Sequence, residues 1–189
     1  MRYLSHPDSL LRRLEELQPL IPSLTTAHLS LRPLLPGDAA SLHRIYRMEG
    51  VLKYFPDPSP PPLEKIQGFI AGQGNHWATH GFGNWGVLPL GEKEIIGWAG
   101  LQFLPELDET EVGFLLSPQH WGKGYATEAA LASLQFGFVG FDLDHIIALV
   151  RSANFASRRV IQKCGMAYTD TVHLWGIDLM RHRLDHPAS

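Results

Sequence analysis

The sequence predicts an α+β fold, in which a mixed, mostly antiparallel, twisted sheet is flanked by helices. Helical and extended patterns follow one another irregularly, and three extended patterns stand side by side in the middle of the chain. A regular alternation of strands and helices, as in a doubly wound parallel fold, does not produce such a run. The length of 189 residues and the 44% hydrophobic content suit a single well-packed domain.

The first third of the chain combines helical patterns with one strand. Leucines recur at helical spacing over residues 9–20, and Pro22 ends this stripe. Residues 28–34 alternate between apolar and polar, which is typical of a strand. Asp38 is expected to be the N-cap of a helix that follows it. A proline-rich loop over residues 56–62 then keeps the chain extended.

After this loop we expect a second helix, because large apolar residues recur near helical spacing at Leu63, Ile66, Ile70 and Trp77. The period then changes. Residues 84–90 and 94–104 predict an antiparallel hairpin with a turn at residues 91–93, and residues 111–117 predict a third, largely apolar strand.

The last third of the chain is expected to alternate. A helix follows residue 124, with a buried face formed by Ala126, Ala130, Leu134 and Phe138. Residues 145–150 are wholly apolar apart from the first, as in a central strand. The next helix is expected to bury Ala156, Val160 and Cys164 and to end at Gly165 as its cap. Two final strands are expected around residues 167–171 and 174–181.

Composition and charge exclude several classes of function. A net charge of −3 produces no basic field, so we expect no nucleic-acid partner. We expect no membrane partner, because no apolar run has the length of a membrane helix and the charged N-terminus is not a signal peptide. The single cysteine, Cys164, suits a reducing compartment, and the protein is expected to be cytoplasmic.

The ten histidines raise the question of a metal site. His76 and His80 are four residues apart and would share a helix face, but the sequence signals no third ligand. We therefore expect no metal.

The stretch "SPQHWGKGYATEAA", residues 117–130, carries the functional signal. Gly122 and Gly124 lie between a strand and a helix, where glycine exposes backbone N–H groups and the first turn of the helix attracts an anion. Lys123 adds a positive charge. A Walker A loop requires Ser or Thr after the lysine, and a dinucleotide fingerprint requires Gly or Ala at the position of Thr127. A diphosphate cradle remains, beside the alternative that the glycines serve turn geometry only.

Gln119, Gly122 and Gly124 form the pattern Gln-x-x-Gly-x-Gly, which resembles the acyl-CoA pyrophosphate loop of the GCN5-related N-acetyltransferase (GNAT) superfamily. Four further blocks resemble its RimJ/RimL-like branch, which acetylates ribosomal-protein N-termini, in the right order. They are "LSLRPLLPGDAASLHRIY", "GFGNWGVLPLGEKEIIGWAGLQFL", "EVGFLLSPQHWGKGYATEAA" and "ANFASRRVIQKCGM". The resemblance runs from about residue 28 to residue 184 and implies the acyl-CoA N-acyltransferase fold. It divides the chain into an N-terminal helical extension, residues 1–24, and a GNAT domain, residues 25–185.

The resemblance implies acetyl-CoA as co-substrate. The strand before the loop would pair with the pantetheine arm through the backbone of Phe114, Leu115 and Leu116. The pyrophosphate would be bound by backbone N–H groups over residues 120–126, which include Lys123, Tyr125 and Ala126. Asn154 would contact the cofactor, although an N-cap is the plainer role of this residue.

The resemblance also implies candidates for proton transfer. Ser157 would protonate the departing thiolate, unless its hydroxyl is bonded to its own helix. Glu111 is the candidate base that removes a proton from the amine, and the alternative is an ordinary charged residue at the start of a strand. His173 and Asp178 are further candidates. The family's tyrosine acid is absent, because Ile161 stands in its place.

The sequence therefore predicts an acyltransferase enzyme, in which an amine attacks the thioester of acetyl-CoA directly within a ternary complex. The amine acceptor is either a peptide N-terminus or a small molecule, and the protein is a monomer or a homodimer. Two alternatives stay open. One is a non-catalytic CoA-binding or interaction module on the same fold, and the other is a nucleotide-binding regulator.

Overall fold

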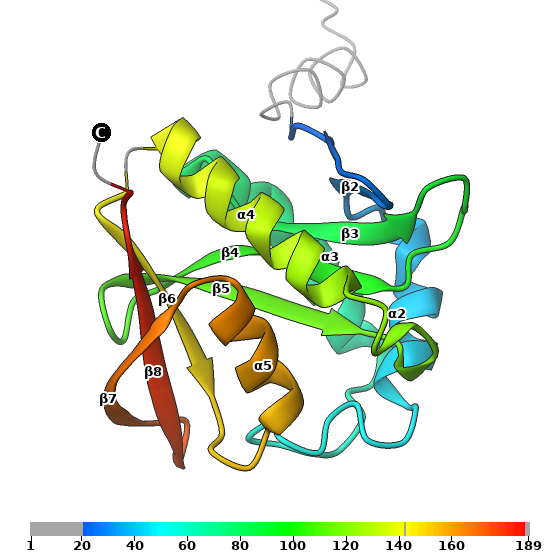
Figure 1. The fold of residues 1–189 in the computed structure, drawn as a ribbon. Coiled ribbons are helices and arrows are strands. Elements are labelled where there is room, and N and C mark those ends of the chain that lie inside the picture. Colours follow the sequence, from blue (N-terminus) through cyan, green and yellow to red (C-terminus); the bar gives the residue numbers. More distant parts are fainter. Residues whose placement is uncertain (1–20, 142, 188–189) are drawn as a thin grey trace, which may run out of the picture.

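The computed structural model describes residues 21–141 and 143–187. The helix expected over residues 9–20 lies outside these residues. Eight strands form one sheet in the order β1-β2-β3-β4-β5-β6-β8-β7 (Figure 1). They are β1 (Leu24–Thr25), β2 (Leu29–Pro33), β3 (Asn84–Pro89), β4 (Gly97–Leu104), β5 (Glu109–Leu116), β6 (His145–Val150), β7 (Ala167–Leu174) and β8 (Ile177–Asp185).

The sheet is mixed and mostly antiparallel, as expected. Every pair of neighbouring strands is antiparallel except β5 and β6, which are parallel. Strand β6 has the bounds that the apolar run predicts. The last two strands are longer than expected, because the chain turns at Trp175 and Gly176, which both have positive φ (54° and 77°). Two such residues form the tight turn that suits the twist of a hairpin.

Helices cover both faces of the sheet. They are α2 (Ala39–Tyr46), α3 (Leu63–His80), α4 (Tyr125–Phe141) and α5 (Phe155–Lys163). In Figure 1, α4 and α5 lie in front of the sheet and α3 lies behind it. Side chains of β5 point alternately to the two faces. Val112 and Leu116 therefore join the core beneath α4, whereas Leu115 joins the second core, with α2 and α3.

The helices lie where the sequence predicts them, but the expected cap of α2 and the expected buried face of α5 differ from the structure. Asp38 is the residue before α2, but its carboxylate binds Arg32 and the Leu35 N–H instead of capping that helix. The expected buried face of α5 is partly wrong. Ala156 is exposed, and Ile161 and Cys164 are the buried side chains of this segment. Gly165 ends the helix in the left-handed conformation, as expected (φ 81°).

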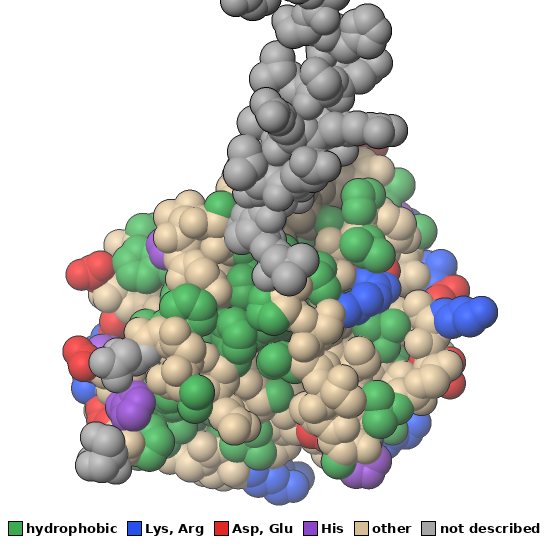
Figure 2. All heavy atoms as spheres, turned by 90° about the horizontal axis from the view of Figure 1, so that it is seen from above, with side chains coloured by type: hydrophobic (Ala, Val, Ile, Leu, Met, Phe, Trp, Pro, Cys, Tyr) green, Lys and Arg blue, Asp and Glu red, His purple; other side chains and the backbone are tan. Residues whose placement is uncertain are grey.

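One end of the molecule carries apolar side chains on its surface. Figure 2, seen from above relative to Figure 1, shows hydrophobic side chains gathered in the middle of this view and charged ones towards its rim. On α4, Leu131 and Val139 are exposed, Val139 at 82%.

The described chain begins with Ile21, which packs against the main core. Leu24, the last residue of the expected extension, pairs with Leu31 in the sheet. Among the described residues, no helix has both the length and the hydropathy needed to cross a membrane.

Candidate active site

The site begins where β5 and β6 separate. The two parallel strands pair only at Glu111 and Ile147. Beyond that pair they point in different directions, β5 across the view of Figure 1 and β6 downward. The backbone groups on the facing edges of the two strands therefore lack a neighbouring strand, although each carries a donor or an acceptor that needs a partner.

The direction of the backbone groups on β5 identifies which of them face this gap. The Ser117 N–H donates to the Ile96 oxygen, at 2.7 Å, on the β4 side. Because backbone groups alternate along a strand, those of Leu115 also point to β4, whereas those of Phe114 and Leu116 point into the gap. The Trp121 Nε1–H donates to the Leu116 oxygen at 2.7 Å. Of the three residues expected to pair with pantetheine, Phe114 and Leu116 thus have the required orientation, and Leu115 does not.

The loop after β5 has the conformation that its glycines allow. It passes through a short 3₁₀ turn, Pro118–His120, and then Gly122 and Gly124 adopt positive φ angles of 76° and 85°. No atom lies within 4 Å of where a Cβ would stand on either glycine, so the space beside the backbone is open. Gln119 and Lys123 are exposed. The loop therefore presents an accessible backbone with one cation beside it.

The loop leads directly into the N-terminus of α4. The Glu128 N–H donates to the Gly124 oxygen, at 3.0 Å. The N–H groups of Tyr125 and Ala126, in the first turn, precede this bond and have no acceptor within the helix. They point out of its positive end, where an anion is favoured. The Glu128 carboxylate also holds the turn before β2, accepting bonds from the Thr26 hydroxyl (2.5 Å) and the His28 N–H (2.7 Å). Helix α4 is thus anchored at the end that faces the loop.

The start of α5 contributes the other expected residues. Asn154 is the N-cap of α5, and its Oδ1 accepts a hydrogen bond from the Ser157 N–H at 3.1 Å. Among the described residues, the Ser157 hydroxyl has no hydrogen-bond partner, so the alternative of a bond to its own helix is not observed. Helix α5 lies on the same side of the sheet as α4 (Figure 1).

Glu111 lies at the point where the strands separate. Its side chain is buried, with 8% of the residue exposed. Oε2 accepts a hydrogen bond from Gln102 Nε2 (2.7 Å), and Oε1 accepts one from the Leu149 N–H (3.2 Å). Burial raises the pKa of Glu111 to about 7, against the opposing effect of these two hydrogen bonds. A carboxylate with this pKa takes up a proton near neutral pH, which suits a general base.

The other titratable candidates have different surroundings. His173 and Asp178 bind one another at 2.7 Å on the exposed β7–β8 hairpin. Cys164 is buried in the main core, which raises the pKa of its thiol to about 11. Ile161, at the position of the family's tyrosine acid, is a core side chain.

Of the two histidines on α3, His76 is held by hydrogen bonds, and His80 lies against the rings of His76, Phe82 and Phe103. The His76 Nδ1–H donates to the Phe82 oxygen at 2.8 Å, and Nε2 accepts from the Phe103 N–H at 3.2 Å. Both ring nitrogens are therefore occupied by protein atoms. No group of three potential metal ligands occurs within residues 21–141 and 143–187.

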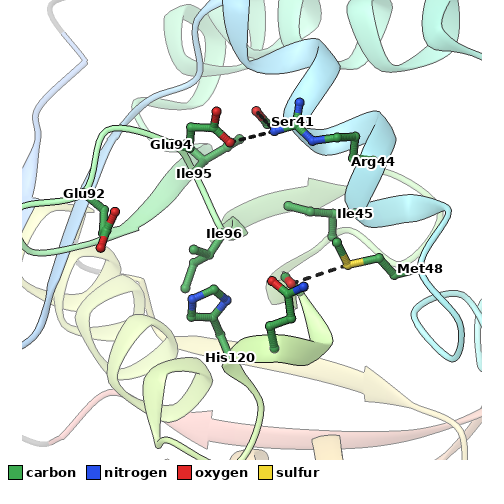
Figure 3. A pocket seen from close by; sticks show the side chains of 11 residues that line it. Ser41, Arg44, Ile45, Met48, Glu92, Glu94, Ile95, Ile96 and His120 are labelled. Carbon is green, nitrogen blue, oxygen red and sulfur yellow. Dashed lines mark hydrogen bonds and ion pairs between the residues drawn. The ribbon is translucent and has the colours of Figure 1, made fainter.

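A cavity of about 420 Å³ adjoins the loop on its α2 side (Figure 3). It lies between α2, the β3–β4 turn and the 3₁₀ turn at residues 118–120. Arg44 on α2 reaches Glu94 at 2.6 Å across it, and His120 closes another side. The sequence did not indicate this cavity, because its walls come from segments about 20 to 70 residues apart, and only the fold brings them together.

Known proteins resemble this chain in sequence and in fold. Residues 28–167 match the family described as "Acetyltransferase (GNAT) domain". The FsC-acetyl coenzyme A-N(2)-transacetylase of Aspergillus fumigatus is 35% identical over 99 residues, which are 48% of this chain and 41% of that protein. The uncharacterized N-acetyltransferase YoaA of Bacillus subtilis is 29% identical over 151 residues, which are 77% of this chain and 83% of YoaA.

Among solved structures, the RimL ribosomal L7/L12 alpha-N-protein acetyltransferase, in complex with coenzyme A, has a TM-score of 0.73 at 16% identity. The match covers 89% of this chain and 99% of that one. At this identity the likeness concerns the fold alone. The chain spans less than half of the length of the first two curated relatives that it matches, 41% and 49%. The matched family covers most of the chain, and the chain belongs to the GNAT acetyltransferase family.

Proposed function

We propose that this chain is an N-acetyltransferase of the RimJ/RimL-like branch. It binds acetyl-CoA in the gap between β5 and β6 and transfers the acetyl group to a primary amine. One observation carries the proposal. The strands separate directly after Glu111, and β5 then leads into a loop with two positive-φ glycines at the N-terminus of α4.

Each part of acetyl-CoA has matching groups on the chain. The diphosphate is held by backbone N–H groups around Gly122 and Gly124 and by those in the first turn of α4, with Lys123 adding charge. The pantetheine amides pair with the gap-facing backbone of Phe114 and Leu116. That RimL, a protein of the same fold, was solved with coenzyme A supports this placement.

The residues at the fork account for the proton transfers. Glu111 takes a proton from the neutral amine as it attacks, directly or through water, and its pKa of about 7 keeps a large fraction ionised at neutral pH. The amine nitrogen forms a bond to the acetyl carbon and the carbon–sulfur bond breaks. Ser157, whose hydroxyl has no partner among the described residues, gives a proton to the leaving thiolate and regains one from water, while Glu111 returns the amine proton to water. Backbone N–H groups on the open edge of β5 polarise the thioester carbonyl.

The acceptor class is a primary amine, either a peptide α-amine or a small molecule. The fungal relative is named an N(2)-transacetylase, and RimL is named an alpha-N-protein acetyltransferase. Both kinds of acceptor therefore belong in the same screen.

The experiment is a thiol-release screen with the full chain, acetyl-CoA and a panel of peptides and small amines, followed by mass spectrometry of the products. We expect an amine-dependent release of free CoA and a product heavier by one acetyl group. CoA binding without transfer to any amine would instead indicate a non-catalytic CoA-binding module. A thermal shift with ATP or NAD that exceeds the shift with CoA would indicate a nucleotide-binding regulator.

A further inference from the structure

Gln102 stands directly opposite Glu111 in the sheet. The two residues are register partners in the antiparallel pair of β4 and β5, so their side chains project from the same face. Gln102 Nε2 donates to Glu111 Oε2 at 2.7 Å, a short hydrogen bond between two side chains that are not exposed. Such a bond to a carboxylate is stronger than one between neutral groups.

The second carboxylate oxygen is held from the other side. Glu111 Oε1 accepts the Leu149 N–H, two residues beyond the single β5–β6 pair. If the two strands continued side by side, a backbone carbonyl of β5 would accept the Leu149 N–H. The Glu111 side chain accepts it instead, just beyond the last paired residues. With one donor on each oxygen, the carboxylate is fixed in the fork between β5 and β6, and the amide of Gln102 is the donor that a side-chain substitution removes without altering the backbone.

We infer that Gln102 is a positioning residue for acetyl transfer, because its amide holds the Glu111 carboxylate in the fork in its anionic form. This inference rests on the proposed function, in which Glu111 accepts the proton of the amine. Gln102 itself touches no reacting atom in this account, and it acts through Glu111.

The surroundings of Glu111 make this donor important. Burial favours the neutral carboxylic acid, and the two hydrogen bonds oppose that effect. Charged side chains on the same face of the sheet, from β5, β7 and β8, pair with one another. Glu109 binds Arg181 at 2.7 Å and His145 at 3.1 Å, and Arg181 also binds Asp170. On the same face Arg183 binds Asp185, and Tyr46 of α2 accepts a bond from Trp98. The burial of Glu111 and its two donors therefore determine where it titrates.

The test replaces Gln102 by methionine, which has a similar length but no donor. We expect the acidic limb of the pH profile of kcat/KM to move to higher pH by about one to two units, because the lost bond favoured the anion. The KM for acetyl-CoA is expected to stay unchanged. Gln73→Met is the matched control. Gln73 also makes one buried hydrogen bond, to the Asn84 N–H at 2.8 Å, but not to Glu111.

Two further measurements keep the outcomes distinct. Gln102→Asn withdraws the amide while keeping a polar side chain, and serves if the methionine variant fails to fold. The ¹³C shift of the Glu111 carboxyl carbon, followed against pH, reports its titration without any turnover. A higher titration midpoint in the Gln102 variants, and not in Gln73→Met, supports the inference.

The inference is overturned if Glu111→Gln abolishes the acidic limb but Gln102→Met and Gln102→Asn leave it at the wild-type pH. That outcome keeps the proposed function. An acidic limb that persists unchanged in Glu111→Gln shows that Glu111 is not the base. That result removes the catalytic role on which the inference depends.

Discussion

The Glu111 carboxylate accepts the Leu149 backbone N–H at 3.2 Å, across the point where β5 and β6 separate. One side chain thus both completes the hydrogen bonding of a parting strand and supplies a titratable group at the site. Polar groups buried in this way are costly when unpaired, so the contact ties the titration of Glu111 to the stability of the fork.

This double role predicts how stability depends on pH. The pKa of Glu111 is raised from 4.5 to about 7 in the folded chain. The folded state therefore holds this proton more tightly than the unfolded state does. The resulting stability is complete below about pH 4.5 and is lost as the pH rises through 7. We expect the free energy of unfolding of wild type to fall, relative to Glu111→Gln, by on the order of 3 kcal/mol between pH 4.5 and pH 8.

Urea unfolding of both proteins over this pH range measures the difference. In Glu111→Gln, the side-chain oxygen of the new glutamine can still accept the Leu149 N–H. The Gln102 amide can rotate so that its own oxygen accepts a hydrogen bond from the new amide group. The variant is therefore expected to fold. Parallel stability curves for the two proteins would contradict the raised pKa.

The glycine loop between β5 and α4 leads to a prediction about CoA binding. Gly122→Asp or Gly124→Asp places a side chain and a negative charge where the diphosphate is proposed to bind, and forces a left-handed conformation on a residue with a Cβ. We expect CoA to bind roughly 100-fold more weakly, or not at all, because like charges would oppose one another. Isothermal titration with CoA measures this loss.

Gly91→Asp is the matched control for the loop variants. Gly91 has a φ of 86° and open space beside it, but it lies in the β3–β4 turn. It carries the same backbone strain, which costs about 1–2 kcal/mol, without the proposed contact. If all three variants lost affinity equally, strain alone would account for the effect and the cradle would be unsupported.

His76 predicts a loss of stability in mild acid. Burial, together with the neighbouring His80, lowers the pKa of His76 below 6.5, although the bond to Phe82 opposes this. The unfolded chain then binds the proton more tightly, so stability is present above about pH 6.5 and declines as the pH falls through the lower folded-state pKa. Protonation of Nε2 also breaks its bond to the Phe103 N–H.

Thermal unfolding at pH 5 and pH 7.5 tests this prediction. We expect His76→Gln to reduce the difference in Tm between the two pH values, and His43→Gln on α2 to leave it at the wild-type value. An undiminished difference in the His76 variant would assign the acid sensitivity to other groups.

We expect the Cys164 thiol to react very slowly with thiol reagents in the folded chain. Its thiol is buried, and burial raises its pKa to about 11, so almost no thiolate forms at pH 8. We expect the native chain to react with an aromatic disulfide reagent at least ~100-fold more slowly than the urea-unfolded chain, and Cys164→Ala to keep acetyl transfer. Rapid labelling of the native chain, or recovery of an acetylated Cys164, would point to an acyl-carrier role.

The sequence predicted those features that depend on neighbouring residues. Strand β6 was found to its last residue because its apolar run is short and bounded. The glycine loop between a strand and a helix was predicted because Gly122 and Gly124 are close together and precede a run of helix formers. The face of α5 was partly wrong, since Ala156 suits either a buried or an exposed position and only tertiary packing decides between them.

Features that depend on strand register were not predictable in the same way. Gln102 and Glu111 are nine residues apart on two strands, and a shift of one residue in the pairing would place them on opposite faces. The orientation of the Leu115 backbone follows from the same register. Leu149 also reaches Glu111 on β5 only through the fold. The sequence therefore indicated the glycine loop, whereas the surroundings of Glu111 required the structure.

A crystal structure of the full chain with acetyl-CoA tests the central claim most directly. We expect the diphosphate at the backbone of Gly122 and Gly124, the pantetheine along Phe114 and Leu116, and the thioester beside the fork at Glu111. Acetyl-CoA bound with its diphosphate away from this loop, or with its thioester away from the fork, would contradict the account.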